Sequence, residues 1–522
     1  MILAAIFSLI IGSLFLAGMD FWRVKAGYQW FLALGIALIS WILLLSSFTP
    51  IPRIFPLMNW ELGEVFSLSP ALLLDQNSWG LGMAITTLFL GVLLTDVARV
   101  REITPNTWAA GMALTGTGLL AIFSANPLTL LLGWAIVDIA ETTALLRHSP
   151  DSSNREQVVI AFSIKVIGML IVVLAMIRSR SLIETLSFIE IPPEIGGYLI
   201  LAAGLRLGVL PPHKLFVKEP FLRRGYGTLV RLVPVAASLI LLVRVASIGA
   251  PSQWEPYVLG VAALAGLYGA FSWITAEDEL DGRPFWILGM AAFAVASATR
   301  GDPSASKIWG LGLLFSGSIL FLYSSRNRLF SVFPLLGWLG FSALPFSPTW
   351  HGLNLFAGWN LVLSGVFILI QALLILGYVR HVFRRGHFQE EMERWGWIIY
   401  PIGLGLLALT HLGMAIFLGD FSRPQGSVLS IVWWGGLYAF LLATLLWLLS
   451  KRKPAFIPRF GAIFSKLFSF GWLYRTFWWL YQFLTVLVGR VSVVLEGEGG
   501  ILWAVLVLIL LMASIVQNSG GG

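Results

Sequence analysis

Five ionisable residues interrupt apolar stretches of the sequence and are the candidates for chemistry. They are Asp138, Glu141, Lys165, Arg206 and His213. A charge within a membrane segment is costly, so such a residue is expected to pair with another or to mark an ion pathway. Carboxylate, amine and imidazole groups can accept and release protons, so these residue types predict proton or ion transfer and no catalysis on a substrate.

Arg206 lies five residues before Pro211, near the end of an apolar segment. Pro211 and Pro212 lack backbone N–H groups and clash with the preceding turn, so the helix is predicted to kink or stop there. Carbonyls freed at membrane depth need protein or a water-filled cavity around them. Arg206 is therefore expected either to pair inside a bundle or to snorkel to the cytoplasmic phosphates. His213 is either a proton gate at the break or a hydrogen-bonded helix-terminal histidine.

Asp138 and Glu141 are three residues apart, so they share one face of a predicted helix. Either acid can pair with Arg206 across the bundle, which would hold the acid ionised, or can itself move protons. Lys165, in the next apolar segment, either titrates with Glu141 as its partner or snorkels toward the cytoplasm. Because a buried lysine can lose its proton and an arginine cannot, Lys165 is the candidate for a titratable cation.

Membrane helices must position these residues. The chain has 522 residues, of which 58% are hydrophobic and 11% are charged, and its mean hydropathy is +0.85. Apolar runs of membrane length recur along the chain, which predicts an all-α polytopic membrane protein with about 14 to 16 transmembrane helices. Basic residues cluster in alternate loops, which predicts that those loops are cytoplasmic and that both termini lie outside a prokaryotic plasma membrane.

The composition excludes several classes of site. There are no cysteines, which rules out disulfides, cysteine-ligated zinc, iron–sulfur clusters and thiol nucleophiles. Only six histidines are present, so no metal, haem or other cofactor is expected, and His411 is predicted to be a hydrogen-bonded core residue. The phosphate-loop, HExxH and GxSxG patterns do not occur. The net charge of +8 is spread over short loops, so it sets topology and predicts no nucleic-acid partner.

A sequence echo divides the predicted bundle. Leu210-Pro211-Pro212, near the end of the seventh predicted span, recurs as Leu344-Pro345 near the end of the twelfth. Five spans is an odd number, so the two units would be inverted in the membrane, as in transporters with broken helices in matching positions. We therefore predict helix breaks near 211 and 345. The position that matches Arg206 in the second unit is Gly340, which carries no charge.

Five divisions of the chain are predicted from these patterns. Residues 1–105 hold N-terminal helices, 106–250 the first repeat, 251–380 the second repeat, 381–460 C-terminal helices, and 461–522 an aromatic segment with a final span. The aromatic stretch 464–494 suits a helix lying along the bilayer or along a neighbouring subunit, or a short buried hairpin.

The seventh span resembles that of the proton-translocating antiporter-like subunits shared by respiratory complex I, membrane-bound hydrogenases and Mrp-type sodium/proton antiporters. In that family a lysine is followed by a proline five residues on and a histidine two further, and here Arg206, Pro211 and His213 stand at those positions. Looser matches at 72–75, 126–134 and 278–280 extend the resemblance over about residues 72 to 418. The resemblance implies two inverted five-helix units with broken seventh and twelfth helices.

The sequence departs from the family where the family carries charge. The glutamate after the tryptophan of the fifth span is Ala135 here, the seventh-span lysine is Arg206, and the eighth-span lysine falls on Ala236. Arg206 can hold a field but cannot pass a proton. The resemblance therefore implies a degraded proton path, with Asp138 or Glu141 as relocated acids.

The resemblance also implies a non-catalytic membrane subunit of a redox-linked complex similar to NADH–quinone oxidoreductase or hydrogenase. Its partners would be other membrane subunits, the lipid bilayer, and protons or sodium ions. The chain would scaffold its neighbours or conduct through Glu141, Lys165 and His213. The alternatives are a free-standing secondary cation/proton antiporter or small-solute transporter, and a purely structural membrane protein whose charges serve topology.

Overall fold

The computed structural model describes most of residues 1–452. The described residues are 1–57, 69–98, 105–148, 152–180, 182, 186–213, 224–325, 327–358, 361–384, 394–418, 424, 430–452 and scattered positions between 478 and 512. The chain divides into two compact units, Met1–Phe468 and Ser469–Gly522, and the helices and strands below belong to the first unit. The predicted aromatic segment 464–494 and the final span fall outside the described residues, apart from those scattered positions.

The described residues fold almost entirely into helices. The α-helices are α1 (Ile2–Phe21), α2 (Ala26–Leu45), α3 (Gln76–Asp96), α4 (Pro105–Ile122), α5 (Pro127–His148), α6 (Ser152–Ser179), α7 (Pro193–Arg206), α8 (Arg224–Val245), α9 (Glu255–Thr275), α10 (Arg283–Thr299), α11 (Pro303–Leu322), α12 (Val332–Phe341), α13 (Leu361–Val382), α14 (Gly396–Phe417) and α15 (Ile431–Arg452). Two 3-10 helices, η2 (Leu329–Ser331) and η3 (Trp350–Phe356), flank α12.

Most of these helices are built to cross a membrane. In the described part of the chain, 11 helices are long and apolar enough to do so. A helix that is apolar on every side belongs in lipid or in the centre of a bundle. Helices also satisfy their own backbone hydrogen bonds, which hydrocarbon requires of any spanning segment. The prediction of an all-α polytopic membrane protein is therefore confirmed.

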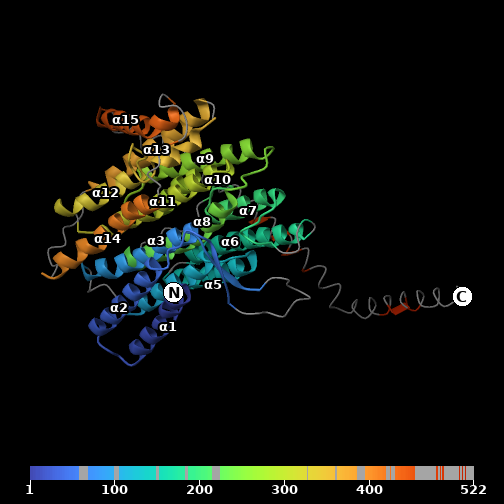
Figure 1. The fold of residues 1–522 in the computed structure, drawn as a ribbon, viewed down its shortest axis with the longest axis horizontal. Coiled ribbons are helices and arrows are strands. Elements are labelled where there is room, and N and C mark those ends of the chain that lie inside the picture. Colours follow the sequence, from blue (N-terminus) through green and yellow to red (C-terminus); the bar gives the residue numbers. More distant parts are fainter. Residues whose placement is uncertain are drawn as a thin grey trace. The chain divides into compact units, whose positions relative to one another are not determined.

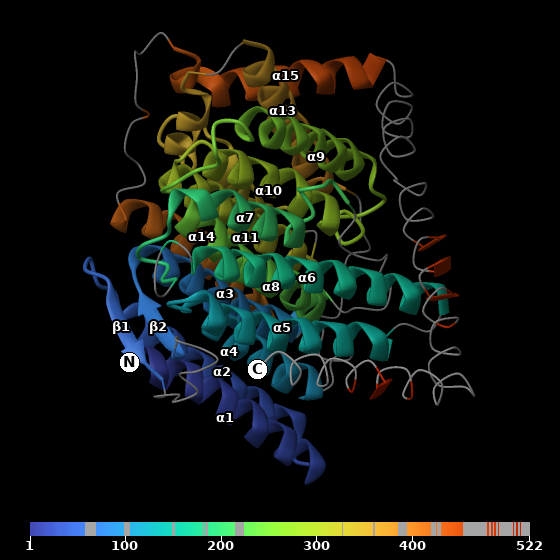
Figure 2. The ribbon, with the colours of Figure 1, turned by 90° about the vertical axis from the view of Figure 1, so that its right-hand side faces the viewer.

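The centre of the bundle consists of α3, α8 and α11. Each of the three is buried along nearly its whole length, and all three contact one another. On one side α4 and α5 cover α8, and α1 and α2 pack on α4; on the other, α10, α9, α13 and α15 follow in sequence of contact. Figures 1 and 2 show this order, with α1 and α2 at one end of the bundle and α15 at the other.

A two-stranded hairpin leads into the central helix α3. Strands β1 (Arg53–Pro56) and β2 (Ala71–Leu74) pair antiparallel, with Arg53 opposite Leu74. Asp75 then accepts a hydrogen bond from the Ser78 backbone N–H at 2.6 Å, and Ser78 Oγ accepts one from the Asp75 N–H at 3.0 Å. This reciprocal capping box satisfies two donors that the helix itself leaves unpaired, so it fixes the residue at which α3 begins.

Helices end near both predicted breaks, α7 at Arg206 and α12 at Phe341; that Pro211, Pro212 and Pro345 break spanning helices stays a prediction. The cause of the first break differs from the one predicted. Gly208 adopts a φ of 78°, and the Val209 and Leu210 N–H groups donate to the Gly204 carbonyl at 2.8 and 3.1 Å. A left-handed glycine of this kind ends a helix by itself, so α7 stops before it reaches the prolines. The inverted-repeat relation and the five divisions of the chain stay predictions.

Candidate functional site

Four of the five predicted residues meet in one buried group where α5, α6 and α7 pack together. Asp138 and Glu141 come from α5, Lys165 from α6 and Arg206 from α7, and all four are buried. Trp134 lies four residues before Asp138 and shares its helix face. The spacing on α5 thus places an aromatic ring and both acids toward the same neighbours.

Arg206 is held by Asp138 in a two-pronged ion pair. Its Nη1 and Nη2 donate to Asp138 Oδ2 and Oδ1 at 2.7 and 2.8 Å, the short distances of charge-assisted hydrogen bonds. Nη1 also donates to the Lys165 carbonyl at 3.2 Å, and Nε donates to Ser238 Oγ at 3.4 Å. The Trp134 ring centre lies 4.0 Å from Cζ, within cation–π range. Arg206 therefore pairs inside the bundle and does not snorkel.

Gly168 of α6 makes room for the Arg206 stem. A Cβ atom at this position would lie 2.8 Å from Arg206 Cγ and 3.3 Å from the Ala202 carbonyl oxygen. Small residues let membrane helices approach closely, and here the approach brings α6 onto α7. The Arg206 guanidinium consequently reaches the carbonyl of Lys165, which lies one turn before Gly168 on α6.

Lys165 lies between the two acids. Its Nζ donates to Glu141 Oε2 and lies 3.7 Å from Asp138 Oδ1. The side chain is only 7% exposed, so it does not snorkel. Glu141 accepts a second hydrogen bond, at Oε1, from Arg231 Nη1 at 3.1 Å. Lys165 thus contacts two carboxylates, each of which also binds an arginine.

Arg231 of α8 is a member of this site that sequence reasoning missed. It is buried and pairs with Glu141, whereas Ala236, the position at which the family carries its lysine, has no charge. The signal was available, because Arg231 is a charge in apolar sequence like the others. Below, the charge cluster means Asp138, Glu141, Lys165, Arg206 and Arg231.

The charge cluster contains two acids and three bases. With every group ionised it carries one excess positive charge. Arginine does not release its proton in a protein, so Lys165 is the one base of the charge cluster that can take part in proton transfer.

His213 lies at the first break and bonds within it. Its Nδ1 donates to the Pro211 carbonyl at 2.9 Å, and its backbone N–H donates to the Gly208 carbonyl at 2.9 Å. Its Nε2 is buried and has no hydrogen-bond partner among the residues that the structure describes. The helix-terminal hydrogen bond is therefore present, and the role of proton gate stays a prediction.

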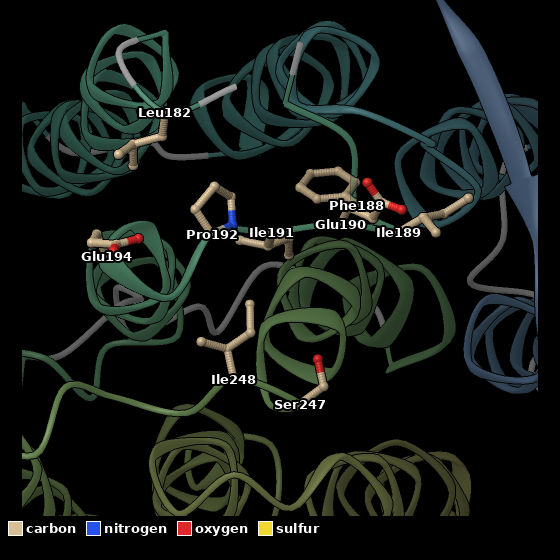
Figure 3. A pocket seen from close by; sticks show the side chains of 9 residues that line it. All are labelled: Leu182, Phe188, Ile189, Glu190, Ile191, Pro192, Glu194, Ser247 and Ile248. Carbon is tan, nitrogen blue, oxygen red and sulfur yellow. The ribbon is translucent and has the colours of Figure 1, made fainter. Parts of the chain in front are cut away.

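A surface pocket of about 520 Å³ lies where α7 begins and α8 ends (Figure 3). Behind its wall, Arg244 Cζ lies 5.3 Å from the Phe188 ring, and Arg244 donates to the Ser124 and Ile122 carbonyls at the end of α4. Arg244 therefore caps orphan carbonyls of a helix end. The charge cluster does not line this pocket, whose residues are Leu182, Phe188, Ile189, Glu190, Ile191, Pro192, Glu194, Ser247 and Ile248.

Metal ligands do not gather in the described part of the chain. No group of three or more histidine, cysteine, aspartate or glutamate side chains there is placed to hold a metal ion. The chemistry of the site is that of buried carboxylates, an amine and two guanidinium groups.

Solved chains from respiratory and Mrp membrane complexes share the fold of this chain. A chain of the membrane-bound sulfane sulfur reductase, an archaeal respiratory membrane complex, matches with a TM-score of 0.71 at 14% identity, over 98% of this chain and 99% of that one. A chain of respiratory complex I from Thermus thermophilus matches with a TM-score of 0.61 at 18% identity, over 85% and 100%.

The Mrp complex from Dietzia sp. DQ12-45-1b supplies a third match. Its chain has a TM-score of 0.71 at 14% identity, over 99% of this chain but only 62% of the Mrp chain. No protein-family model matches the sequence, and no curated protein matches it. At these identities the similarity is one of fold, and the site must be interpreted from its own residues.

Proposed function

We propose that the chain is a proton-conducting membrane subunit of a redox-linked complex, with Lys165 as its titratable group. The observation that carries the proposal is the position of Lys165 Nζ, bonded to Glu141 and 3.7 Å from Asp138 in the buried core. The structures that share its fold come from respiratory and Mrp complexes. Other membrane subunits are accordingly its proposed partners, in a prokaryotic plasma membrane with both termini outside.

The charge cluster can pass a proton through two of its groups. Transfer from Lys165 Nζ to Glu141 Oε2, along their hydrogen bond, makes both groups neutral. Release of that proton from Glu141 leaves two carboxylates facing the two guanidinium groups, so the excess positive charge disappears. Uptake of another proton restores the starting state. Arg206 and Arg231 stay charged throughout, and Asp138 stays ionised because the Arg206 guanidinium binds both its oxygens.

The geometry favours a proton over a sodium ion. A protonated lysine has no acceptor to offer a metal cation, and both carboxylates of the charge cluster already bind cationic side chains. A sodium ion would have to displace one of those side chains, whereas a proton needs only an existing hydrogen bond.

Proton uptake into vesicles that contain the intact complex tests the proposal. Lys165→Met removes the amine and keeps the length of the stem, and uptake is expected to fall by a factor of about ten or more. Lys25→Met is the matched control, because Lys25 is exposed before the start of α2. Uptake by Lys165→Met at the parent rate would refute the proposal. A silent parent in an assembled complex would identify the chain as a scaffold.

A further inference from the structure

The second helix break has a polar site of its own. Gly340 stands on α12 at the position that matches Arg206. A Cβ atom there would lie 2.7 Å from His411 Nδ1 and 3.1 Å from Ser316 Oγ. An imidazole from α14 and a hydroxyl from α11 thus converge on the same point of glycine backbone.

Gly337, one turn earlier on α12, also lets a polar side chain approach the helix backbone. A Cβ atom there would lie 2.5 Å from Tyr378 Oη, and Tyr378 donates a hydrogen bond to the Ser316 carbonyl at 3.0 Å. Two glycines on one helix face therefore admit polar side chains from α11, α13 and α14. All of these side chains are buried, so the site is inside the protein and away from lipid.

The hydrogen bonding of this site is incomplete. Ser316 Oγ is fully buried and has no hydrogen-bond partner among the described residues, although buried hydroxyl groups are nearly always bonded to protein or water. His411 is buried, as predicted, and its ring stacks on Phe315 with centroids 4.9 Å apart and planes 13° apart. The stacking fixes the plane of the ring and leaves Nδ1 directed at Gly340.

We propose that His411, Ser316 and a bound water molecule form a neutral proton-transfer site, in which α14 supplies the ionisable ring that α12 lacks. The inference rests on the proposed function. The bound water molecule relays a proton to one ring nitrogen, where an N–H bond forms, and the N–H bond at the other ring nitrogen breaks as that proton passes to water on the far side of the ring; the imidazole is left neutral in its other tautomer. No electron moves and no fixed charge takes part, so this site works differently from the charge cluster.

Exchange of the His411 ring N–H with water tests the site without any transport measurement. In the intact complex with isotope-labelled histidine, the His411 signal is the one lost in His411→Gln. We expect it to exchange with water within seconds, and to exchange more slowly in Ser316→Ala. His381 is the buried control, since its Nε2 bonds the Trp273 carbonyl at 3.0 Å. A His411 ring protected from deuterium oxide for hours would overturn the inference.

Proton uptake by the complex in vesicles then tests the transfer step. We expect His411→Gln to lower uptake about tenfold. His351→Gln, at a half-buried position on η3, should stay within a factor of about two of the parent rate. Uptake by His411→Gln at the parent rate would overturn this inference without contradicting the proposed role of Lys165. A parent that takes up no protons would refute the proposed function, and with it the transfer role of His411, whatever its water exchange.

Discussion

Removing one partner of the Asp138–Arg206 pair should destabilise the bundle far more than removing both. Asp138→Leu leaves the Arg206 guanidinium facing a leucine side chain, and the charge cluster then has three bases and one acid. Arg206→Leu leaves two acids and two bases, and Asp138 can then pair with Lys165, whose Nζ is 3.7 Å away. The double variant has one acid and two bases, which restores the single excess charge of the parent.

The magnitudes follow from this count. Breaking a buried ion pair from one side costs about 3–5 kcal/mol, whereas replacing the whole pair with apolar side chains is often neutral. Asp138→Leu should cost about 5 kcal/mol and Arg206→Leu about 3 kcal/mol. The double variant should lose less than about 2 kcal/mol, so the coupling between the two substitutions should exceed about 6 kcal/mol.

Reversible unfolding in mixed detergent micelles, followed by tryptophan fluorescence, measures these free energies. The control is the pair between Arg300 and Glu255, which is equally short at 2.8 Å but whose side chains are 29% and 30% exposed. Glu255→Leu should cost less than about 1 kcal/mol. Additive effects of Asp138→Leu and Arg206→Leu, or equal costs at the buried and exposed pairs, would refute the electrostatic account of the charge cluster.

Two further predictions concern the close packing at Gly168 and the pairing of Arg231 with Glu141. Gly168→Ala should cost about 1–3 kcal/mol because its Cβ would meet the arginine stem, whereas Gly35→Ala in α2, with nothing within 4 Å, should stabilise by about 0.5–1 kcal/mol; equal shifts in the unfolding assay would contradict the close packing of α6 on α7. Arg231→Met should leave Glu141 without its hydrogen bond to α8, so the carboxylate is no longer held in place beside Lys165 and proton uptake in vesicles should fall; uptake at the parent rate would count against Glu141 as the acceptor of the Lys165 proton.

The membership of the charge cluster was largely predictable, and its pairs were among the alternatives that the sequence left open. The cost of a charge in apolar sequence is enough to select Asp138, Glu141, Lys165 and Arg206. Whether Arg206 and Lys165 pair or snorkel depends on how deep each lies and which helix faces it, and both quantities come from packing. The all-α membrane fold also followed from composition.

Other features depend on contacts between distant segments. Gly168 matters because α7 happens to cross α6 at that residue, and nothing in its neighbouring sequence states this. Arg231 was not predicted because the resemblance places the family's lysine at Ala236, five residues further along α8. The first break was assigned to the prolines, but the left-handed backbone at Gly208 ends α7 before they are reached. In each case local sequence named a suitable residue and tertiary packing chose among the candidates.

The proposed function divides between two residues the tasks that a single buried lysine can combine. In that proposal Arg206 on α7 supplies a permanent positive charge, and Lys165 on α6 supplies an exchangeable proton. Asp138 links them, since its carboxylate binds Arg206 at 2.7 Å and lies 3.7 Å from Lys165. Because that carboxylate binds the arginine, the lysine would face a negative charge while it gives up its proton to Glu141. On the proposed function, a fixed charge beside a mobile proton accounts for the three bases that lie around two acids in the core of this bundle.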